Sequence, residues 1–394
     1  MQVAAIRAAL EKNLREMLGD PGLRVTALSG SRPTIDEERE PWIGVKYGTP
    51  GLDDWYGVVP ATVEFRPSNT GTTERLRLAV KVNPAEGLAR TLNSWIIRER
   101  GIALNRPYTD YYAAREFDHT GAREYHLFRA LAPGAPSLQK VLPRCYGGVA
   151  DEPGGEHAIF LEYLENVARL DASGAEGDWP IEAIASALSV AGGWHGAFLG
   201  TVEDMDDAFA APRATTAQRI ADEGLWRGLL DDARQRFPDI MTEAVWRRRH
   251  HIIDTIDVWH QIKDRLPVTL VHDDFNNRNC GFRPAPVVLD WELVSRDTPQ
   301  RDLVELLTFV LPAGAGRSEV DALVEGHRQS VIQAAGHNPQ EALDSETFRD
   351  AFRAELKLQA INRIGHQFLF SAAFPLAYLA RINACIEHLL DLYD

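Results

Sequence analysis

The spacing of apolar and polar residues changes character near residue 180 of this chain. Before that point, short runs of β-branched and aromatic residues are separated by turn-forming residues, a pattern typical of strands. Between residues 23 and 82 we expect four strands, at residues 23–28, 42–47, 61–65 and 76–82. These segments predict an antiparallel sheet in the first part of the chain.

Apolar residues also recur at helical spacing in two places before residue 180. Residues 1–18 place charged side chains between apolar positions, which predicts an amphipathic helix and not a signal peptide. Residues 121–131 show the same periodicity and predict a second helix. Two further strands are expected at residues 143–146 and 158–161.

Beyond residue 180 the periodicity is mostly helical. The expected helices cover residues 181–199, 216–237, 242–266, 302–311, 317–335 and 345–393, with a break in the last near Pro375. We therefore predict an α+β fold of two lobes. A small β-rich lobe with an antiparallel sheet occupies residues 1–165, and a larger, mostly helical lobe occupies residues 166–394.

Composition and charge narrow the class of protein. The chain has 394 residues, of which 45% are hydrophobic and 25% charged, as expected for a soluble globular protein. Its longest apolar runs are far shorter than the ~20 residues of a membrane span, so we expect a cytoplasmic protein. The net charge of -15 argues against nucleic-acid binding and slightly favours an amine-bearing partner. The three cysteines, Cys145, Cys280 and Cys385, are expected to be reduced thiols without zinc spacing.

The candidate chemistry is concentrated between residues 272 and 303. His272 and Asp274 begin a loop that reaches Asn279, a β-branched strand at residues 286–289 ends at Asp290, and Asp302 opens an apolar helix. Transfer of a phosphoryl group to a hydroxyl needs one carboxylate near the acceptor proton and hard oxygen ligands for magnesium. We predict that Asp274 orients and accepts the proton of an acceptor hydroxyl, and that Asn279 and Asp290 hold Mg²⁺ on the ATP phosphates.

These residues resemble the aminoglycoside phosphotransferase and choline kinase-like superfamily, whose members are related to protein kinases. The usual pattern is His-Gly-Asp-x-x-x-x-Asn, then Asp-Trp or Asp-Phe, then Asp-Leu at a helix start. The resemblance implies a bilobal kinase-like fold in which Asp274 is the catalytic aspartate and Asn279 and Asp290 bind magnesium. It also implies that His272 and Asp302 brace the catalytic loop.

One position departs from the superfamily pattern, because Asp273 replaces the common glycine. This second carboxylate has three interpretations from sequence. It raises the proton affinity of Asp274, it meets a cationic group of the acceptor, or it points away into solvent.

The resemblance also assigns roles upstream. Lys81, on a strand, is implied to hold the ATP phosphates, and Glu124 to pair with it. The hinge strand that hydrogen-bonds adenine is implied at Glu162, Tyr163 and Leu164. His195 lies on the expected helix packed behind the catalytic loop, where a structural role is favoured over a catalytic one.

Two features leave alternatives open. The chain has no GxGxxG and no GxxxxGK[ST] motif, so the turns at residues 48–51 and 68–73 compete as the loop that covers the phosphates. The C-terminal aromatic residues Phe368, Phe370, Phe374 and Tyr378 form either a helical core or the wall of an acceptor pocket.

The sequence therefore predicts an ATP- and magnesium-dependent phosphotransferase that acts on a hydroxyl of a small molecule, such as an aminoglycoside-like antibiotic or another natural product. A first alternative is a kinase that phosphorylates Ser or Thr side chains of a precursor peptide, with a lyase as a possible partner. A second alternative is a kinase-like module that binds nucleotide without transferring phosphate.

Overall fold

A computed structural model describes residues 1–30, 55–83, 119–151, 155–171, 177–207, 209–336, 343–372 and 374–393, together with Arg98 and Gly174. The chain divides into two compact units. The first lies within Met1–Ala89 and His119–Val167, and the second within Ala168–Asp394. The strand expected at residues 42–47 and the turn at residues 48–51 lie outside the described residues.

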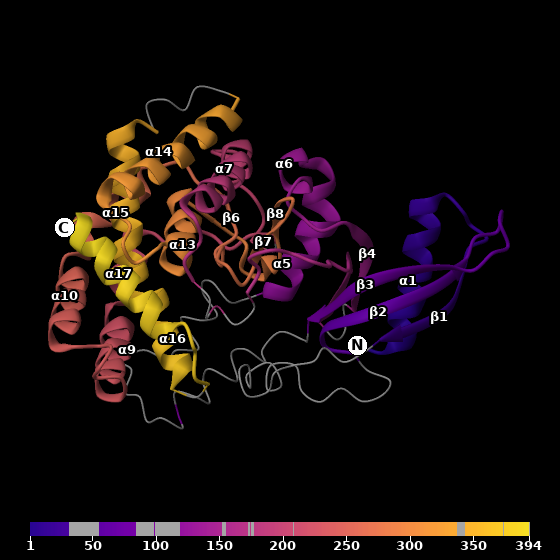
Figure 1. The fold of residues 1–394 in the computed structure, drawn as a ribbon, viewed down its shortest axis with the longest axis horizontal. Coiled ribbons are helices and arrows are strands. Elements are labelled where there is room, and N and C mark those ends of the chain that lie inside the picture. Colours follow the sequence, from indigo (N-terminus) through magenta and orange to yellow (C-terminus); the bar gives the residue numbers. More distant parts are fainter. Residues whose placement is uncertain are drawn as a thin grey trace. The chain divides into compact units, whose positions relative to one another are not determined.

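The first unit contains a five-stranded antiparallel sheet (Figure 1). The strand order is β1-β2-β3-β5-β4. The strands are β1 (Arg24–Gly30), β2 (Gly57–Arg66), β3 (Glu74–Asn83), β4 (Cys145–Asp151) and β5 (Glu156–Glu162). The expected antiparallel sheet in the N-terminal part of the chain is therefore confirmed.

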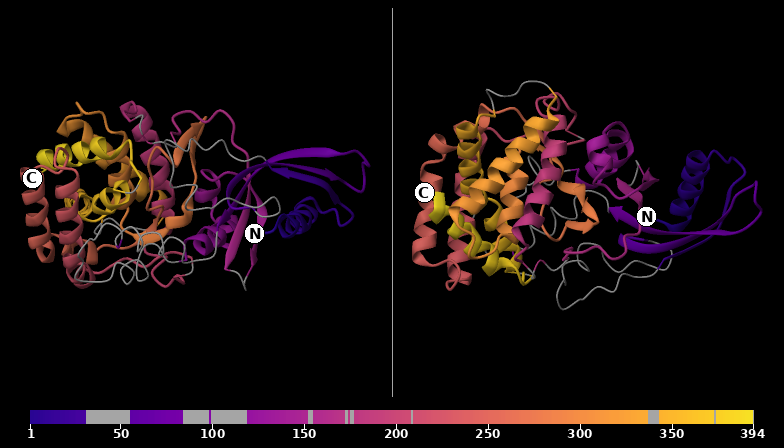
Figure 2. Two further views of the ribbon diagram at one scale, coloured as in Figure 1. Left: turned by 90° about the horizontal axis from the view of Figure 1, so that it is seen from below. Right: turned by 45° about the horizontal axis from the view of Figure 1, so that its top comes forward.

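Helix α1 (Val3–Leu18) covers one face of this sheet (Figure 2). Its buried residues Ile6, Leu10 and Leu14 share one apolar core with strand residues that include Leu78 and Val80. Since successive side chains of a strand point to opposite faces, Lys81 points to the face away from α1. One face of β3 therefore packs in the core, and the other face carries the charged side chain of Lys81.

Helix α5 (Thr120–His126) carries Glu124 and lies close to β3. At Gly121 an added Cβ would lie 2.8 Å from the Cβ of Asn83, so this helix start approaches the strand more closely than any larger residue allows. The chain continues through a π-helical turn (Leu127–Leu131), a 3₁₀ turn (Ala132–Gly134) and α6 (Pro136–Gln139).

The second unit is mostly helical, as expected (Figure 1). Its helices are α7 (Ile181–Phe198), α8 (Thr216–Ala221), α9 (Glu223–Arg236), α10 (Glu243–Asp254), α11 (Ile256–Trp259), α12 (Gln261–Asp264), α13 (Gln300–Val310), α14 (Arg317–Ala334), α15 (Ser345–Ile361), α16 (Arg363–Ser371) and α17 (Leu379–Tyr393). Every residue of α13 is buried. Because α13 is fully buried, the residues at its start are held in place by the packing of the helix.

Three expected helices are broken more often than the sequence pattern indicated. Residues 216–237 form α8 and α9, with an interruption at Asp222. Residues 242–266 form α10, α11 and α12, with interruptions at Thr255 and His260. The C-terminal stretch is broken at Asn362 as well as near Pro375. Asn362 accepts a hydrogen bond from the Trp226 indole at 3.2 Å, a tertiary contact that helical periodicity does not reveal.

Two short antiparallel strand pairs lie among these helices. Strand β6 (Thr269–Val271) pairs with β9 (Ser295–Asp297), and β7 (Cys280–Arg283) pairs with β8 (Ala285–Val288). The expected strand at residues 286–289 is present as β8, and the strand before His272, β6, belongs to the other pair. The loop between β6 and β7 and the residues after β8 carry the candidate chemistry.

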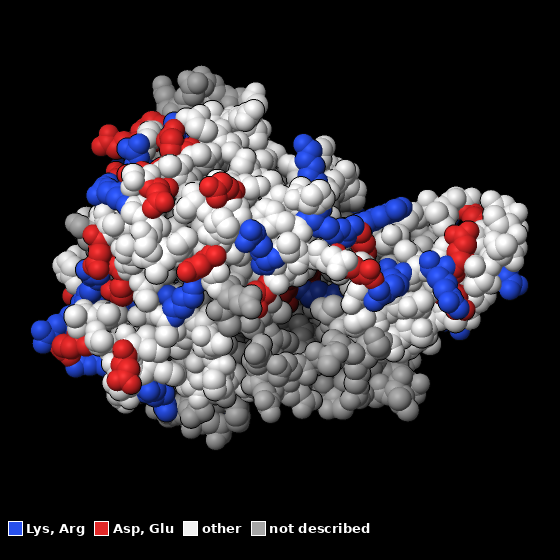
Figure 3. All heavy atoms as spheres, viewed as in Figure 1, with Lys and Arg blue, Asp and Glu red and all other residues white. Residues whose placement is uncertain are grey.

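Acidic and basic side chains alternate over the helices of the second unit on the face shown in Figure 3. The three consecutive arginines on α10 also lie beside acidic residues. Arg248 pairs with Glu387 and Asp391 on α17 at 3.1 and 2.6 Å, and Arg249 pairs with Glu387 at 2.9 Å. This basic run therefore serves helix packing. Within the described ranges, no helix has the length and apolarity that a membrane crossing requires.

Candidate functional site

In the first unit, the structure brings Lys81 and Glu124 together. The Lys81 Nζ lies 2.6 Å from Glu124 Oε2, and the two side chains are 7% and 1% exposed. Asn83 also donates its amide to Glu124 Oε2 at 3.4 Å. The carboxylate of Glu124 offsets the cost of burying the Lys81 charge and fixes the position of the ammonium group.

The strand register locates one of the two candidate turns, residues 68–73, relative to Lys81. Lys81 is paired with Val58 near one end of the β2–β3 ladder, whereas Glu74 is paired with Phe65 at the other end. The turn at residues 68–73 joins these strands next to Glu74. Seven residues at about 3.3 Å each place it roughly 23 Å along the strand from Lys81. This turn is a simple hairpin connection and does not lie near Lys81.

The expected hinge begins at the end of β5. The backbone NH of Glu162 donates to the Arg144 carbonyl at 2.8 Å, so this NH serves the sheet. Within the described part of the chain, neither Tyr163 nor Leu164 donates its backbone NH to another main-chain group. The Arg77 guanidinium stacks over the Tyr163 ring at 4.2 Å and orders this segment.

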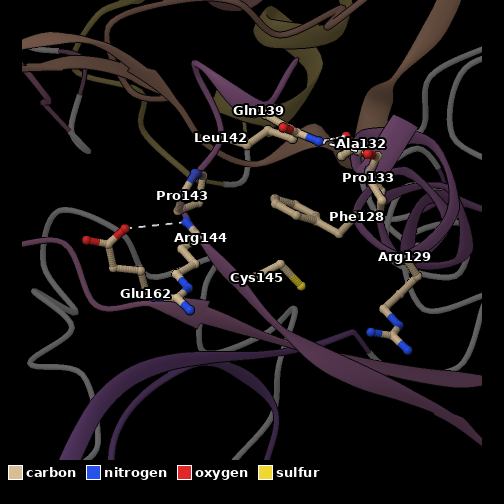
Figure 4. A pocket seen from close by; sticks show the side chains of 10 residues that line it. All are labelled: Phe128, Arg129, Ala132, Pro133, Gln139, Leu142, Pro143, Arg144, Cys145 and Glu162. Atoms are coloured by element: carbon tan, nitrogen blue, oxygen red, sulfur yellow. Dashed lines mark hydrogen bonds between the residues drawn. The ribbon is translucent and has the colours of Figure 1, made fainter. Parts of the chain in front are cut away.

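The Glu162 side chain lines a pocket of about 440 Å³ that lies within the first unit (Figure 4). Its walls include Phe128, Arg129, Arg144 and Cys145, and the backbone NH of Arg144 donates to the Glu162 carboxylate at 3.4 Å. Neither Lys81 nor Glu124 lines this pocket. It is therefore separate from the buried ion pair.

In the second unit, Asp274 lies at the centre of a dense set of hydrogen bonds. Its Oδ1 accepts from Asn276 Nδ2 at 2.9 Å and from Arg278 Nη2 at 3.0 Å. Its Oδ2 accepts from Arg278 Nη2 at 3.1 Å and from Asn279 Nδ2 at 2.7 Å. Asp274 and Asn279, which the sequence placed in one motif, are thus in direct contact.

The pKa of Asp274 reflects this environment. Burial alone would raise the pKa of the carboxyl, but the positive charges of Arg278 and Arg363 and the nearby His272 outweigh burial and lower it. Asp290 acts in the opposite direction through its negative charge. The lowered pKa favours the ionised carboxylate form of Asp274.

Asp290 is brought beside this loop through its neighbour Leu289. The Leu289 NH donates to the Asn279 carbonyl at 2.8 Å, and the Leu289 carbonyl accepts from His272 Nε2 at 2.8 Å. Asp290 itself adopts a left-handed backbone conformation with φ 60°. One residue therefore ties the end of β8 to both ends of the motif that contains Asp274.

Asp302 braces the loop from α13. Its Oδ2 accepts from the His272 NH at 2.8 Å and from His195 Nε2 at 3.0 Å, and its Oδ1 accepts from the Asp273 NH at 2.9 Å. Burial raises the pKa of Asp302, but the hydrogen bonds and charges of His195 and His272 outweigh burial and lower it. His195 also contacts His327 at 3.3 Å and is fully buried, so its position supports the loop from behind.

Asp273 is buried and does not point into solvent, so that interpretation of the sequence was wrong. Its carboxylate contacts the Arg301 guanidinium, lies 3.4 Å from Arg363 Nη2 and accepts from Ser295 Oγ at 3.2 Å. The pKa of Asp274 is lowered, which does not agree with the interpretation that Asp273 raises its proton affinity. The backbone at Asp273 has φ 64°, the left-handed conformation that glycine adopts most easily.

The partners of Asp273 extend into a buried network. Arg301 Nη1 donates to Glu355 Oε1 at 3.1 Å and to Gln359 Oε1 at 2.9 Å. Gln359 donates to Glu305 Oε2 at 2.7 Å, and Glu305 Oε1 accepts from Asn276 at 3.2 Å. The network therefore holds residues 273 and 276, which lie on either side of Asp274 in the loop.

The residues present suit a magnesium ion. Asn279 Nδ2 also donates to the Asp274 carbonyl at 3.0 Å, so the amide nitrogen is committed and Oδ1 is the atom left for a metal. Over the described residues, no group of three or more His, Cys, Asp or Glu side chains is arranged to hold a metal. Magnesium fits this pattern because it commonly uses one or two protein oxygens together with substrate phosphates and water.

Several residues of this site were not predicted from sequence. Arg278, Arg301, Arg363 and Asn276 all contact the loop or its supports. Arg278 carried a usable signal, because it stands four residues after Asp274 and forms an ion pair at that spacing. Of the C-terminal aromatic residues, Phe368 packs on Phe237, whereas Tyr378 lies beside Arg278.

Comparisons with known proteins place the chain in a family. Solved structures that resemble it include macrolide 2'-phosphotransferase from Brachybacterium faecium (17% identity, 95% of this chain and 97% of that chain covered, TM-score 0.40). A second is the GDP complex of aminoglycoside 2'-phosphotransferase-IIIa (14% identity, 96% of this chain and 97% of that chain covered, TM-score 0.42). A third is a choline/ethanolamine kinase family protein from Mesorhizobium loti (13% identity, 90% of this chain and 99% of that chain covered, TM-score 0.34). No curated protein matches the sequence significantly.

The decisive match is a profile of the phosphotransferase enzyme family, which covers residues 109–337 and hence more than half of the chain. This range contains the whole loop from His272 to Asn279, as well as Asp290 and Asp302. The expected resemblance to aminoglycoside phosphotransferases is confirmed, and this chain belongs to the phosphotransferase enzyme family.

Proposed function

We propose that this phosphotransferase moves the γ-phosphoryl group of ATP to an alcohol hydroxyl of a small molecule, with Mg²⁺ as the metal. The observation that carries the proposal is the hydrogen-bonded arrangement of Asp274, Asn279 and Leu289, which holds a carboxylate, an amide oxygen and Asp290 in one loop system. A site of this composition provides a proton acceptor and metal ligands and little else. That is what phosphoryl transfer requires.

Asp274 orients the acceptor hydroxyl and accepts its proton as the new P–O bond forms and the bond from the γ-phosphorus to the bridging oxygen of ADP breaks, with ADP as the leaving group. The lowered pKa keeps Asp274 ionised, and the Asp302 brace fixes the backbone of His272 and Asp273 immediately before it. Positioning is thus built into the loop before any ligand arrives, and preorganisation of this kind supplies much of the rate enhancement in phosphoryl transfer.

Asn279 and Asp290 would hold magnesium, which neutralises charge on the nucleotide phosphates when bound. In the first unit, Lys81 would contact the phosphates, and the main chain at Tyr163 and Leu164 would contact adenine. The acidic chain favours an amine-bearing acceptor only weakly, because many of its carboxylates are paired with arginine on helix surfaces.

The direct experiment is a panel of hydroxyl compounds that includes aminoglycosides, macrolides, choline, sugars and Ser- or Thr-containing peptides. ADP release is measured with and without Mg²⁺, and the products are weighed by mass spectrometry. We expect one phosphoryl group on a small alcohol, only with the metal present. Phosphorylated peptide with no turnover of small alcohols would support the peptide alternative, and nucleotide binding without any transfer would support the binding module.

Asp290→Ala is expected to weaken magnesium-dependent binding of ATP as well as turnover, because it removes one of the two proposed protein ligands. Calorimetric titration with ATP in the presence and absence of Mg²⁺ checks this. The exposed residue Asp257 on α11 provides the control, since Asp257→Ala removes the same charge outside the site. Unchanged magnesium dependence in Asp290→Ala would remove Asp290 from the proposed metal site.

Lys81→Met is expected to raise the KM for ATP roughly tenfold or more, the effect of losing one charged hydrogen bond. The KM for the acceptor should change much less. Lys140→Met, which changes an exposed lysine of the same unit, is the matched control. Equal KM values for ATP in the Lys81 variant and the wild type would contradict the proposed phosphate contact.

A further inference from the structure

We propose that Arg278 is a positioning residue of the transfer reaction: it clamps the Asp274 carboxylate in the resting protein and gives up one contact when the acceptor hydroxyl arrives. This inference rests on the proposed function. It concerns a residue to which the motif, as read from sequence, assigned no role.

The clamp is a direct one. A single Arg278 nitrogen, Nη2, lies 3.0 and 3.1 Å from the two carboxylate oxygens of Asp274. Arg278 Nε and the Arg278 NH both donate to Asn276 Oδ1, at 3.3 and 3.0 Å. The side chain of Asn276 therefore aligns the guanidinium with Asp274 while it donates to the same carboxylate.

The hydrogen bonds of Asp274 leave no room for an additional donor. A carboxylate offers about four acceptor positions. Asn276 and Asn279 fill one each, and Arg278 fills one on each oxygen. A substrate hydroxyl can reach Asp274 only if one of these three donors gives way.

Arg278 is the donor best suited to move. Asn276 is fully buried and also donates to Glu305, and Asn279 also donates to the Asp274 carbonyl. Arg278 is 19% exposed and has a long side chain. Its departure from one oxygen would not disturb the backbone of the loop.

Two aromatic rings form the surface over which the guanidinium of Arg278 would move. The guanidinium lies 5.5 Å from the centre of the Phe309 ring and 5.3 Å from that of Tyr378, and Nη1 donates to the Tyr378 hydroxyl at 3.5 Å. Contacts of this kind hold a cation without fixing its direction. Arg278 can therefore release one oxygen of Asp274 while its guanidinium stays against the two rings.

The test compares Arg278→Lys, Arg278→Gln and Arg278→Ala in a phosphoryl-transfer assay, with Arg353→Gln as the control. Arg353 pairs with Asp350 within α15 and is half-exposed. Loss of the clamp in Arg278→Gln is expected to lower kcat by roughly 10²-fold, the usual effect of losing one preorganised donor. The Kd for ATP should be unchanged, and the lysine variant should retain intermediate turnover.

Two further measurements separate positioning from a structural role. Added guanidinium ion should restore part of the turnover of Arg278→Ala, whereas urea should not. In the Asp274→Asn background, Arg278→Gln should cause no additional loss of kcat, because Arg278 acts through Asp274. Full kcat in Arg278→Gln, or equal losses of kcat with and without the Asp274 carboxylate, would overturn the proposal.

The outcome remains decisive if the wild type phosphorylates no acceptor. That result would refute the proposed function, and the contact between the two residues would then be judged by urea unfolding. The same pair of single variants and their double variant should shift the unfolding midpoint non-additively. Additive shifts would overturn the clamp.

Discussion

Asp274→Ala is expected to reduce turnover by ~10²- to ~10⁴-fold while ATP binding stays nearly intact. The carboxylate is the proposed proton acceptor, and it contacts Asn279 but is not itself a proposed metal ligand. The measurement is steady-state turnover of the best acceptor, together with calorimetric titration of ATP.

Asp274→Asn is the sharper companion variant. The alanine variant leaves the Arg278 guanidinium without its main partner, whereas asparagine keeps one acceptor oxygen for it. A similar loss of turnover in both variants would identify the missing proton acceptor as the cause. Wild-type turnover in Asp274→Asn would contradict the assignment of Asp274.

Asp273→Ala is expected to destabilise the protein by about 3–5 kcal/mol, the usual cost of removing one partner from a buried ion pair. The Arg301 and Arg363 side chains are 4% and 7% exposed and both contact the Asp273 carboxylate. Without it, their charges rely on Glu355 and on the more distant Glu305. The free energy of unfolding in urea measures the loss.

Asp273→Gly isolates the backbone contribution at the same position. It removes the same carboxylate but relieves the left-handed conformation at φ 64°, which costs a residue with a Cβ about 1–2 kcal/mol. The glycine variant should therefore be less destabilised than the alanine variant by about that amount. A glycine variant more stable than the wild type by about 1–2 kcal/mol would show that the ion pairs add nothing, because only the strain relief would then remain.

The sequence predicted well those helices and strands that depend on the local spacing of apolar residues. The alternating positions of β2 and β3 and the long helices α7 and α14 lie within a few residues of the expected ranges. The interruptions at Thr255 and Asn362 were missed. Breaks of this kind depend on packing partners distant in sequence, such as Trp226 for Asn362, and apolar periodicity contains no information about them.

The candidate site was likewise predicted only in part. The motif spacing placed Asp274 next to Asn279, and the strand before Asp290 brought that residue to the same loop. The network behind the loop could not be predicted, because Arg301 meets Glu355 and Gln359 across 54 and 58 positions of the chain. The burial of Asp273 could not be predicted for the same reason, since its arginine partners come from α13 and α16.

The most direct test of the central claim is a crystal structure of the protein with a non-hydrolysable ATP analogue and Mn²⁺ in place of magnesium, in which anomalous scattering locates the metal. The account predicts a metal bonded to Asn279 Oδ1 and to the Asp290 carboxylate, with the terminal phosphate facing Asp274. A nucleotide-bound metal that contacts neither of these side chains would contradict it.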